Sequence, residues 1–331
     1  MLSELPVLGI CGWSGCGKTT LIEAVLPLLI ERNLRVAVAK YDMHCIDVDR
    51  PGKDSDRFFR AGADVYLQGD EEFIRLHLDS GRDLQTRLKS LARQYDLILV
   101  EGHKWAPLSK VWLLHEGETQ PPPTINGIKA VLPRNEGRVE KFMDFLIDWL
   151  STQWLKIPVS GCVVAKGPND RTVKLERRGR KEESAFPEKA GRELEKVVQD
   201  IVFPGTGEAT EGTENHIHLP SAVHAGDALA GLLAAMRWNS SMSWLVVDIA
   251  AHITAEALQW LLSMRSPGVW AILPRVDEGE DIRPFPAYFD FRFQGLLESF
   301  LENKSSDINL LSHGKIITPR PPAHLCDVWQ G

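Results

Sequence analysis

The chain has 331 residues, of which 44% are hydrophobic, and its formal net charge is −7. This length predicts two domains of ordinary size, each with enough apolar residues to bury a core. A net negative chain lacks the basic surplus of a general nucleic-acid binder, so no nucleic-acid partner is expected. We recognise neither a membrane helix of ~20 apolar residues nor a signal peptide, and the five cysteines have no C-x-x-C spacing. We therefore expect a soluble, cytoplasmic protein with reduced thiols and no membrane contact.

In the first half, short apolar runs alternate with stretches of helical periodicity. Strands are predicted at residues 6–10, 34–39, 95–100, 110–114 and 128–132. Helices are predicted at residues 20–32, 84–94 and 139–150. Strands that alternate with helices predict an α/β fold with a mostly parallel sheet and helices on both faces.

The alternation begins again after residues 151–158, which we interpret as a domain boundary. Strands are predicted at residues 159–165, 244–249 and 269–273, and helices at residues 225–236, 254–263 and 293–302. The predicted domains are therefore residues 1–152 and residues 157–331, both of the α/β class.

A complete phosphate-loop (P-loop) motif, G-x-x-x-x-G-K-[ST], follows the first predicted strand. It consists of Gly12, Trp13, Ser14, Gly15, Cys16, Gly17, Lys18 and Thr19, and Thr20 continues into the predicted helix. The glycines let the backbone curl so that its N–H groups point at phosphate oxygens, and the helix N-terminus adds a positive dipole end. Lys18 is predicted to reach the β- and γ-phosphates, and the Thr19 hydroxyl to ligate Mg²⁺. The strand–loop–helix context predicts binding of a nucleoside triphosphate.

A P-loop needs an acidic partner at the end of a neighbouring strand, which holds the magnesium ion or its water. Glu101 follows the apolar run at residues 97–100 and is the first candidate for this acid. Asp42, just beyond the second predicted strand, is the second candidate. The alternative for both is an ordinary loop carboxylate, because turns commonly carry acidic residues.

Three stretches together resemble the molybdopterin-guanine dinucleotide biosynthesis protein B family (MobB) over residues 6–150. They are the P-loop through Leu21, the P-G-K-D-S stretch from Pro51 to Ser55 followed by Arg57, and the V-E-G-H-K stretch from Val100 to Lys104. The family carries phenylalanine where this chain has His103. The resemblance implies binding of GTP with Mg²⁺ and a role in attaching GMP to molybdopterin. It also implies a molybdenum cofactor guanylyltransferase or molybdoenzymes as partners, and it allows a homodimer.

Three cations near one end of the predicted sheet, Lys53, Arg57 and Lys104, are candidates for contact with a pterin phosphate or a partner enzyme. The alternative is that they are solvated surface charges, which are common. The sequence contains no N-K-x-D tetrapeptide to recognise guanine. The expectation of GTP in place of ATP therefore rests on the resemblance alone.

The second half is similar to the molybdenum cofactor guanylyltransferase family (MobA). The similar segments are residues 226–235, Trp244-Leu-Val-Val, and Pro284-Phe-Pro-Ala-Tyr288. The family's glycine turn around the triphosphate is incomplete here, with Gly167, Arg171 and Lys174 as its remnants. Its metal aspartate is displaced to Asp248 and lacks the proline that follows it in the family. Because two features of metal-assisted transfer are altered together, we expect a degenerate module that binds or docks.

The sequence therefore predicts a GTP-binding protein of molybdenum cofactor biosynthesis that is at most a slow GTPase. Hydrolysis is expected to be slow because no glutamine or arginine finger is apparent near the loop. Two alternatives stay open: a P-loop kinase of a small metabolite, and a non-enzymatic adaptor to a separate guanylyltransferase or molybdoenzyme.

Overall fold

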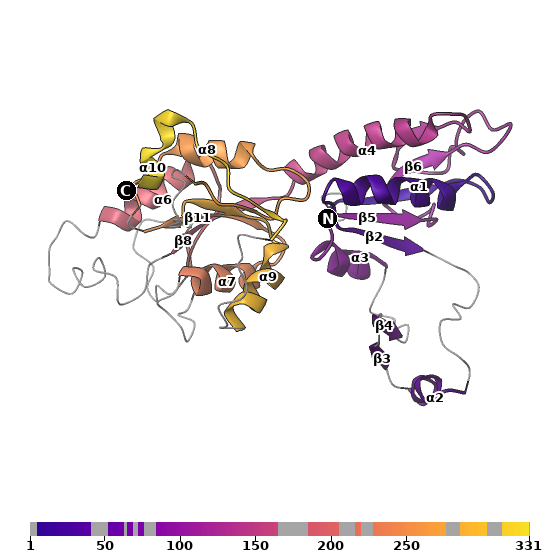
Figure 1. Cartoon of the computed structure of the whole chain (residues 1–331), viewed down its shortest axis with the longest axis horizontal. Helices are drawn as coiled ribbons and strands as arrows, with labels where there is room; N and C mark the ends of the chain where they lie inside the picture. The colour runs from indigo at the N-terminus through magenta and orange to yellow at the C-terminus, as the bar shows by residue number, and fades with distance from the viewer. Residues whose placement is uncertain are drawn as a thin grey trace.

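A computed structural model describes most of the chain. The described residues are 5–40, 52–62, 65–68, 72–75, 84–164, 185–204, 216–219, 228–249, 251–275, 285–302 and 313–330. Within them the chain forms two large sheets and one small two-stranded sheet (Figure 1). None of the described helices has the length and apolar character needed to span a bilayer.

The first large sheet has five strands, and every neighbouring pair is parallel. Its order is β2-β5-β1-β6-β7, formed by Val36–Lys40, Leu97–Glu101, Val7–Cys11, Ser109–Leu113 and Ile128–Leu132. Side chains alternate between the faces of β1, so Leu8 and Ile10 pack with α1 (Lys18–Glu31) and α4 (Arg138–Leu155), while Val7 packs with α3 (Leu84–Ala92). The predicted helix-covered parallel sheet is thus confirmed.

A separate arm is formed by α2 (Asp54–Arg60), β3 (Val65–Gln68) and β4 (Glu72–Arg75), and β3 and β4 pair antiparallel. Figure 1 shows this arm apart from the five-stranded sheet. None of these three elements is among those predicted from the sequence.

The second large sheet has seven strands in the order β10-β9-β8-β11-β13-β12-β14. These are His216–Leu219, Ile201–Pro204, Val159–Val164, Ser243–Asp248, Ala287–Phe289, Ala271–Ile272 and Ile316–Ile317. The strand β13 runs antiparallel to both neighbours, and the other pairs are parallel. One face is covered by α7 (Ala228–Trp238) and α9 (Phe293–Glu302). The other is covered by α6 (Ala185–Glu195), α8 (Ala255–Ser263) and α10 (Asp327–Gln330), with the short helix η3 (Ala323–Leu325) beside α10. This confirms a second α/β unit.

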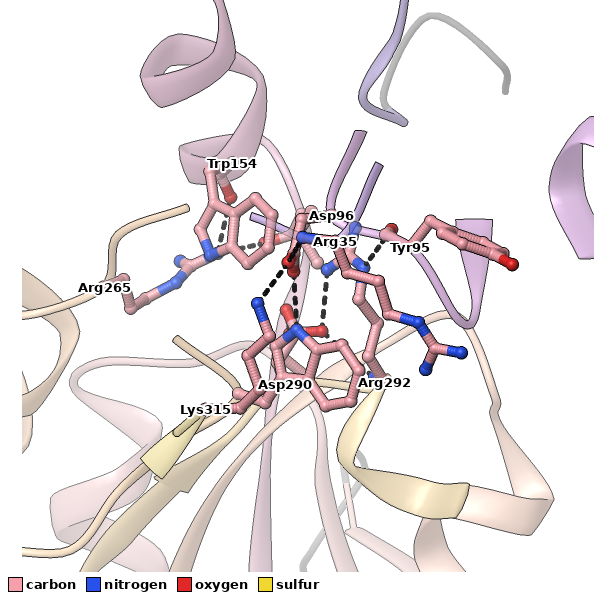
Figure 2. Close-up of polar contacts among 11 residues, drawn as sticks. Arg35, Tyr95, Asp96, Trp154, Arg265, Asp290, Arg292 and Lys315 are labelled. Carbon is pink, nitrogen blue, oxygen red and sulfur yellow. Dashed lines mark hydrogen bonds and ion pairs between the residues drawn. The ribbon is translucent and has the colours of Figure 1, made fainter. Parts of the chain in front are cut away.

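The two sheets meet at a junction formed by Tyr95, Asp96, Trp270, Arg292 and Lys315, together with Asn33 and Gly314 (Figure 2). Asp96 is fully buried and accepts hydrogen bonds from the Trp270 indole at 2.6 Å and from Lys315 Nζ at 2.7 Å. Arg292 Nε donates to the Tyr95 carbonyl at 2.9 Å. Nearby, Lys315 Nζ also donates to the Asn33 carbonyl.

Each of these contacts lies at the edge where parallel strands begin. Asp96 directly precedes β5, Trp270 precedes β12 and Lys315 precedes β14. Arg292 follows β13, which runs in the opposite direction and therefore ends at the same edge. The sheets consequently meet through their amino edges, and their carboxyl edges face away from each other.

The helix α4 carries the chain from one core into the other (Figure 1). Its Phe142, Leu146 and Leu150 pack in the core of the first half, whereas Trp154 packs in the core of the second. The Arg292 guanidinium lies 4.3 Å from the centre of the Trp154 ring. Arg265 also donates to the Trp154 carbonyl at 2.9 Å, so the end of α4 is held by two cations of the second half.

Candidate nucleotide-binding site

The predicted P-loop connects β1 to α1 at the carboxyl edge of the first sheet, which we call the P-loop edge. Gly12 has φ of 151°, and a Cβ placed there would lie 2.5 Å from Cys16 Sγ and 2.6 Å from the Leu113 carbonyl oxygen. Gly15 and Gly17 are also left-handed, with φ of 75° and 89°. Because side chains other than glycine rarely adopt these angles, the motif's spacing of glycines fixes the curl of the loop.

Lys18 lies across this loop. Its Nζ donates to the Gly12 carbonyl at 3.2 Å and to the Trp13 carbonyl at 2.9 Å. A lysine in this position of a P-loop reaches the β- and γ-phosphates of a bound triphosphate. The ammonium group therefore marks the γ-phosphate end of the candidate site, and it places the Trp13 backbone at that end.

The two predicted magnesium groups are in direct contact, since the Thr19 hydroxyl donates to Glu101 Oε1 at 2.9 Å. Glu101 is the last residue of β5, whose pairing with β1 brings it beside the loop. A hydroxyl and a carboxylate are hard oxygen donors of the kind that Mg²⁺ takes together with substrate phosphates. No cluster of three or more metal-ligating side chains occurs among the described residues, so phosphate oxygens and water would complete the ion's shell. Asp42, the second candidate acid, lies outside the described residues.

Arg138 holds the backbone of the P-loop through hydrogen bonds, a role that was not predicted from the sequence. Its guanidinium donates to the Cys16 carbonyl at 2.7 Å, to the Pro133 carbonyl at 2.7 Å and to the Leu114 carbonyl at 3.1 Å. These bonds connect the P-loop to the ends of β6 and β7. Burial lowers the pKa of this guanidinium, yet arginine remains charged at physiological pH. The sequence gives little sign of this role beyond the presence of an arginine at the first residue of α4.

The three predicted phosphate-contacting cations lie in different places. Lys104 is beside the P-loop, with its Nζ 4.1 Å from the centre of the Trp13 ring. Lys53 and Arg57 belong to the arm that contains α2, and Arg57 pairs with Asp54 at 3.6 Å on an exposed surface. The structure therefore brings Lys104 but not the α2 cations to the loop (Figure 1). A contact of any of the three with a pterin phosphate stays a prediction.

Two further residues near the loop are His103, in the V-E-G-H-K stretch, and Lys110, on β6. Lys110 is buried, and its Nζ donates to the carbonyls of Ala106, Leu108 and Asn126 rather than facing the loop. His103 has φ of 49°, and burial lowers the pKa of its imidazole, which therefore is neutral at pH 7.

In the second half, Asp248 ends β11 and is 7% exposed. It lies at the carboxyl edge of its sheet, the edge where open α/β folds bind ligands. Gly167, Arg171 and Lys174 lie outside the described residues. The degenerate character of this module therefore stays a prediction.

The model of the family described as "Molybdopterin guanine dinucleotide synthesis protein B" matches residues 7–132. The molybdopterin-guanine dinucleotide biosynthesis adapter protein of Haemophilus influenzae is 34% identical over 166 residues, which cover 45% of this chain and 92% of that protein. The chain belongs to the MobB family. The adapter protein of Escherichia coli is 31% identical over 169 residues, covering 45% of this chain and 95% of that protein. The MobB similarity thus spans nearly all of these relatives and less than half of this chain.

A solved structure of 2-C-methyl-D-erythritol 4-phosphate cytidylyltransferase from Thermus thermophilus is also similar to the chain. It is 13% identical, with a TM-score of 0.33, and the match covers 51% of this chain and 91% of that one. At this identity and score, nothing about activity follows from the likeness.

Proposed function

We propose that this MobB-family protein binds GTP with Mg²⁺ at its P-loop and serves molybdopterin-guanine dinucleotide biosynthesis as an adapter. The observation that carries the proposal is the joint placement of three groups at one sheet edge. These are the glycine-shaped loop, the Lys18 ammonium across it, and the Thr19–Glu101 hydrogen bond of 2.9 Å. Together they supply an anion cradle, a cation for the terminal phosphates, and oxygen donors for a metal ion.

On this proposal the metal ion, when bound, neutralises charge on the phosphates, and the chain's own residues position the nucleotide. Lys18 moves from the carbonyls of Gly12 and Trp13 to the phosphate oxygens, while Arg138 keeps the loop backbone in place. Thr19 and Glu101 would hold the ion or its water shell. The second half, at the opposite side of the molecule, acts as a binding or docking module for a molybdopterin-bearing partner, either a guanylyltransferase or a molybdoenzyme.

The test is calorimetric titration of the full chain and of its Lys18→Ala variant with GTP and with ATP, each in the presence of Mg²⁺. Loss of a charge-assisted phosphate contact costs ~1.5–3 kcal/mol, so the GTP affinity should fall about tenfold or more. Lys141→Ala, at an exposed position of α4, is the matched control and should bind as the parent does. Unchanged GTP affinity in a folded Lys18→Ala protein would refute the P-loop assignment, and equal affinity for ATP would refute the choice of base.

The metal role of Glu101 is tested by titration with and without Mg²⁺. Glu101→Gln keeps the size of the side chain but removes the charge that holds the metal shell, so the mutant should lose most of the Mg²⁺ dependence of binding. Glu23→Gln, at an exposed position of α1, is the control. If GTP binding depends equally on Mg²⁺ in Glu101→Gln and in the parent, Glu101 is not the metal partner and Asp42 becomes the first alternative.

A further inference from the structure

The imidazole of His115 lies directly against the P-loop. His115 follows β6 and Leu114 at the P-loop edge and is half-buried. Its Nε2 lies 3.8 Å from the position that a Cβ would take at Gly15, the middle one of the three loop glycines. Because Gly15 has no side chain, nothing separates the ring from the backbone of the loop.

Two hydrogen bonds fix the placement of His115. Its backbone N–H donates to Glu118 Oε2 at 2.8 Å, and Glu118 Oε1 accepts from the indoles of Trp13 and Trp112 at 3.1 and 3.2 Å. Its Nδ1 lies 3.3 Å from the Glu116 carbonyl oxygen. Because a carbonyl oxygen can only accept, Nδ1 carries the hydrogen of the neutral ring and the lone pair is on Nε2. A proton taken up by the ring therefore binds at the nitrogen that faces the loop.

Charged groups of both signs surround this ring. Glu116 and Glu118 follow it in the chain, and Arg134 lies 4.0 Å from the Glu116 carboxylate. The other charged or titratable side chains that contact this side of the P-loop, among the described residues, are Lys18, Lys104, Arg138 and Cys16. A triphosphate bound at the loop would add net negative charge beside them, even with one Mg²⁺. Nucleotide binding therefore changes the charge around the imidazole.

Imidazole is the side chain whose charge ordinarily changes between pH 5 and 8. Phosphates attract the protonated ring, so a bound proton and a bound nucleotide strengthen each other's affinity by the same factor. The sign follows from this linkage: nucleotide affinity rises as the pH falls, and binding takes up a proton. The ring also lines an open hollow together with Trp13 and Ser14 of the loop, which gives water access to it.

We propose that His115 is a further anion-binding residue of the nucleotide site, and that its protonation ties nucleotide affinity to pH. When protonated at Nε2, it adds a positive charge beside Gly15. When neutral, it leaves the phosphates to the loop N–H groups and Lys18. This inference rests on the proposed triphosphate site, and the experiment separates the two.

The experiment is calorimetric titration of the full chain with GTP at fixed, saturating Mg²⁺, at about pH 8 and about pH 5.5. His115→Gln keeps a polar side chain of similar size but cannot take up a proton. Protonation of GTP itself affects parent and variant alike, so the ratio of their affinities is the readout. This ratio should rise about fivefold or more toward acid pH, because opposite unit charges a few ångströms apart attract by that factor even in water.

Proton uptake gives a second readout. Titrations in two buffers of different ionisation enthalpy, at about pH 6.5, should show a proton taken up with GTP by the parent and less uptake by His115→Gln. His324→Gln, which removes an exposed imidazole in η3 of the second half, is the matched control and should behave as the parent does. Inorganic tripolyphosphate, which lacks base and ribose, should depend on His115 as GTP does.

The outcomes separate the inference from the proposed function. Equal pH dependence in the parent and His115→Gln would overturn the inference, as would a dependence that His103→Asn removes and His115→Gln retains. GTP binding that needs Lys18 but not His115 would leave the proposed function standing. If Lys18→Ala binds GTP and tripolyphosphate as the parent does, or neither ligand binds, both proposals fail. Tripolyphosphate binding that needs Lys18 and His115, without GTP binding, would remove the choice of nucleotide and retain the role of His115.

Discussion

Asp96 is a buried carboxylate whose hydrogen-bond partners come from both halves of the chain. Its Oδ2 accepts from the Arg35 backbone N–H at 2.7 Å and from Lys315 Nζ at 2.7 Å, and its Oδ1 accepts from Trp270 (Figure 2). A buried ion pair offsets its own desolvation only when both charges are present and further hydrogen bonds satisfy them. The junction therefore depends on the charge of this one side chain.

Asp96→Asn should destabilise the full chain strongly. The amide keeps the shape but leaves the Lys315 ammonium buried without a countercharge, and breaking a buried pair in this way costs about 3–5 kcal/mol. Urea unfolding followed by circular dichroism measures the loss. Asp144→Asn, at an exposed position of α4, is the control and should change the free energy of unfolding by no more than about 0.5 kcal/mol. Equal stability of the two variants would contradict the structural role of the pair.

Cys11 ends β1 beside the P-loop, and its thiol donates to the Gly102 carbonyl at 3.1 Å. Burial raises the pKa of this thiol to about 11, with nearby lysines opposing the shift. Because the thiolate is the reactive form and appears only near pH 11, Cys11 should resist iodoacetamide at pH 8, whereas the half-buried Cys326 should react. Mass spectrometry of the alkylated native protein measures both rates. Modification of Cys11 as fast as Cys326 at pH 8 would show that the end of β1 is open to solvent.

At the scale of elements, α4 is the connection on which the two cores depend. The apolar periodicity indicated an end at residue 150, because Ser151, Thr152 and Gln153 interrupt it. The helix continues to Leu155, where Trp154 gains burial in the second core, and the hydroxyls of Ser151 and Thr152 are satisfied by carbonyls one turn earlier. The residues that bury Trp154 include Arg265 and Arg292, which lie more than 100 positions later in the chain. The apolar spacing within the helix carries no information about such distant contacts.

Trp154→Ala should destabilise the protein, while Leu155→Ala should not. The Trp154 side chain is fully buried under the Arg292 guanidinium, and removing a buried tryptophan side chain costs about 3–5 kcal/mol. Leu155 is 61% exposed, so its truncation should stay within about 0.5 kcal/mol. Denaturant unfolding of the two variants measures the loss in free energy of unfolding for each. Similar losses for these adjacent residues would mean that helix propensity, rather than the buried contact, controls this end of α4.

The elements that sequence predicted well are those whose pattern is local. The strand Ile128–Leu132 and the helix Phe293–Glu302 have the predicted bounds, and the P-loop with Glu101 was identified from motif and strand order. The three-residue strand β13 and the β3–β4 pair are too short to show a period. Arg138 was missed because its role arises when the ends of β6 and β7 come beside the loop. Such an approach is set by tertiary packing and leaves no spacing in the sequence.

At the scale of the whole molecule, the two carboxyl edges are on opposite sides. The strand β5 has five residues and β11 has six, so at ~3.3 Å per residue the two sheets alone separate Glu101 from Asp248 by roughly 35 Å. A nucleotide held at the P-loop therefore cannot reach the carboxyl edge of the second sheet in the same chain. On the proposed function, transfer of a GTP-derived group at the second sheet would use a separate nucleotide or a separate protein.

This arrangement predicts that residues 1–152 alone bind GTP as tightly as the full chain but unfold more easily. The P-loop, Glu101 and Arg138 all lie within this fragment, at the edge away from the junction, and distant independent sites couple by only ~0.3–0.5 kcal/mol, or about twofold in affinity. A chain of that length buries ~70% of its unfolded surface, which is enough for an independent domain. Its stability should nevertheless fall, because Asp96 loses Lys315 and Trp270, and α4 loses Trp154.

Calorimetry with GTP and urea unfolding of the fragment and the full chain measure the two effects separately. Lys18→Ala in the fragment is the control for specific binding. The complementary fragment, residues 157–331, should fold with reduced stability, because it lacks the Trp154 side chain of its core, and it should release no pyrophosphate from GTP and molybdopterin. If the first fragment is folded and binds GTP ten times more weakly than the full chain, the second half supports the nucleotide site and the back-to-back separation is not functional. Pyrophosphate release by the second fragment would instead make the carboxyl edge at Asp248 a working transferase site with its own nucleotide.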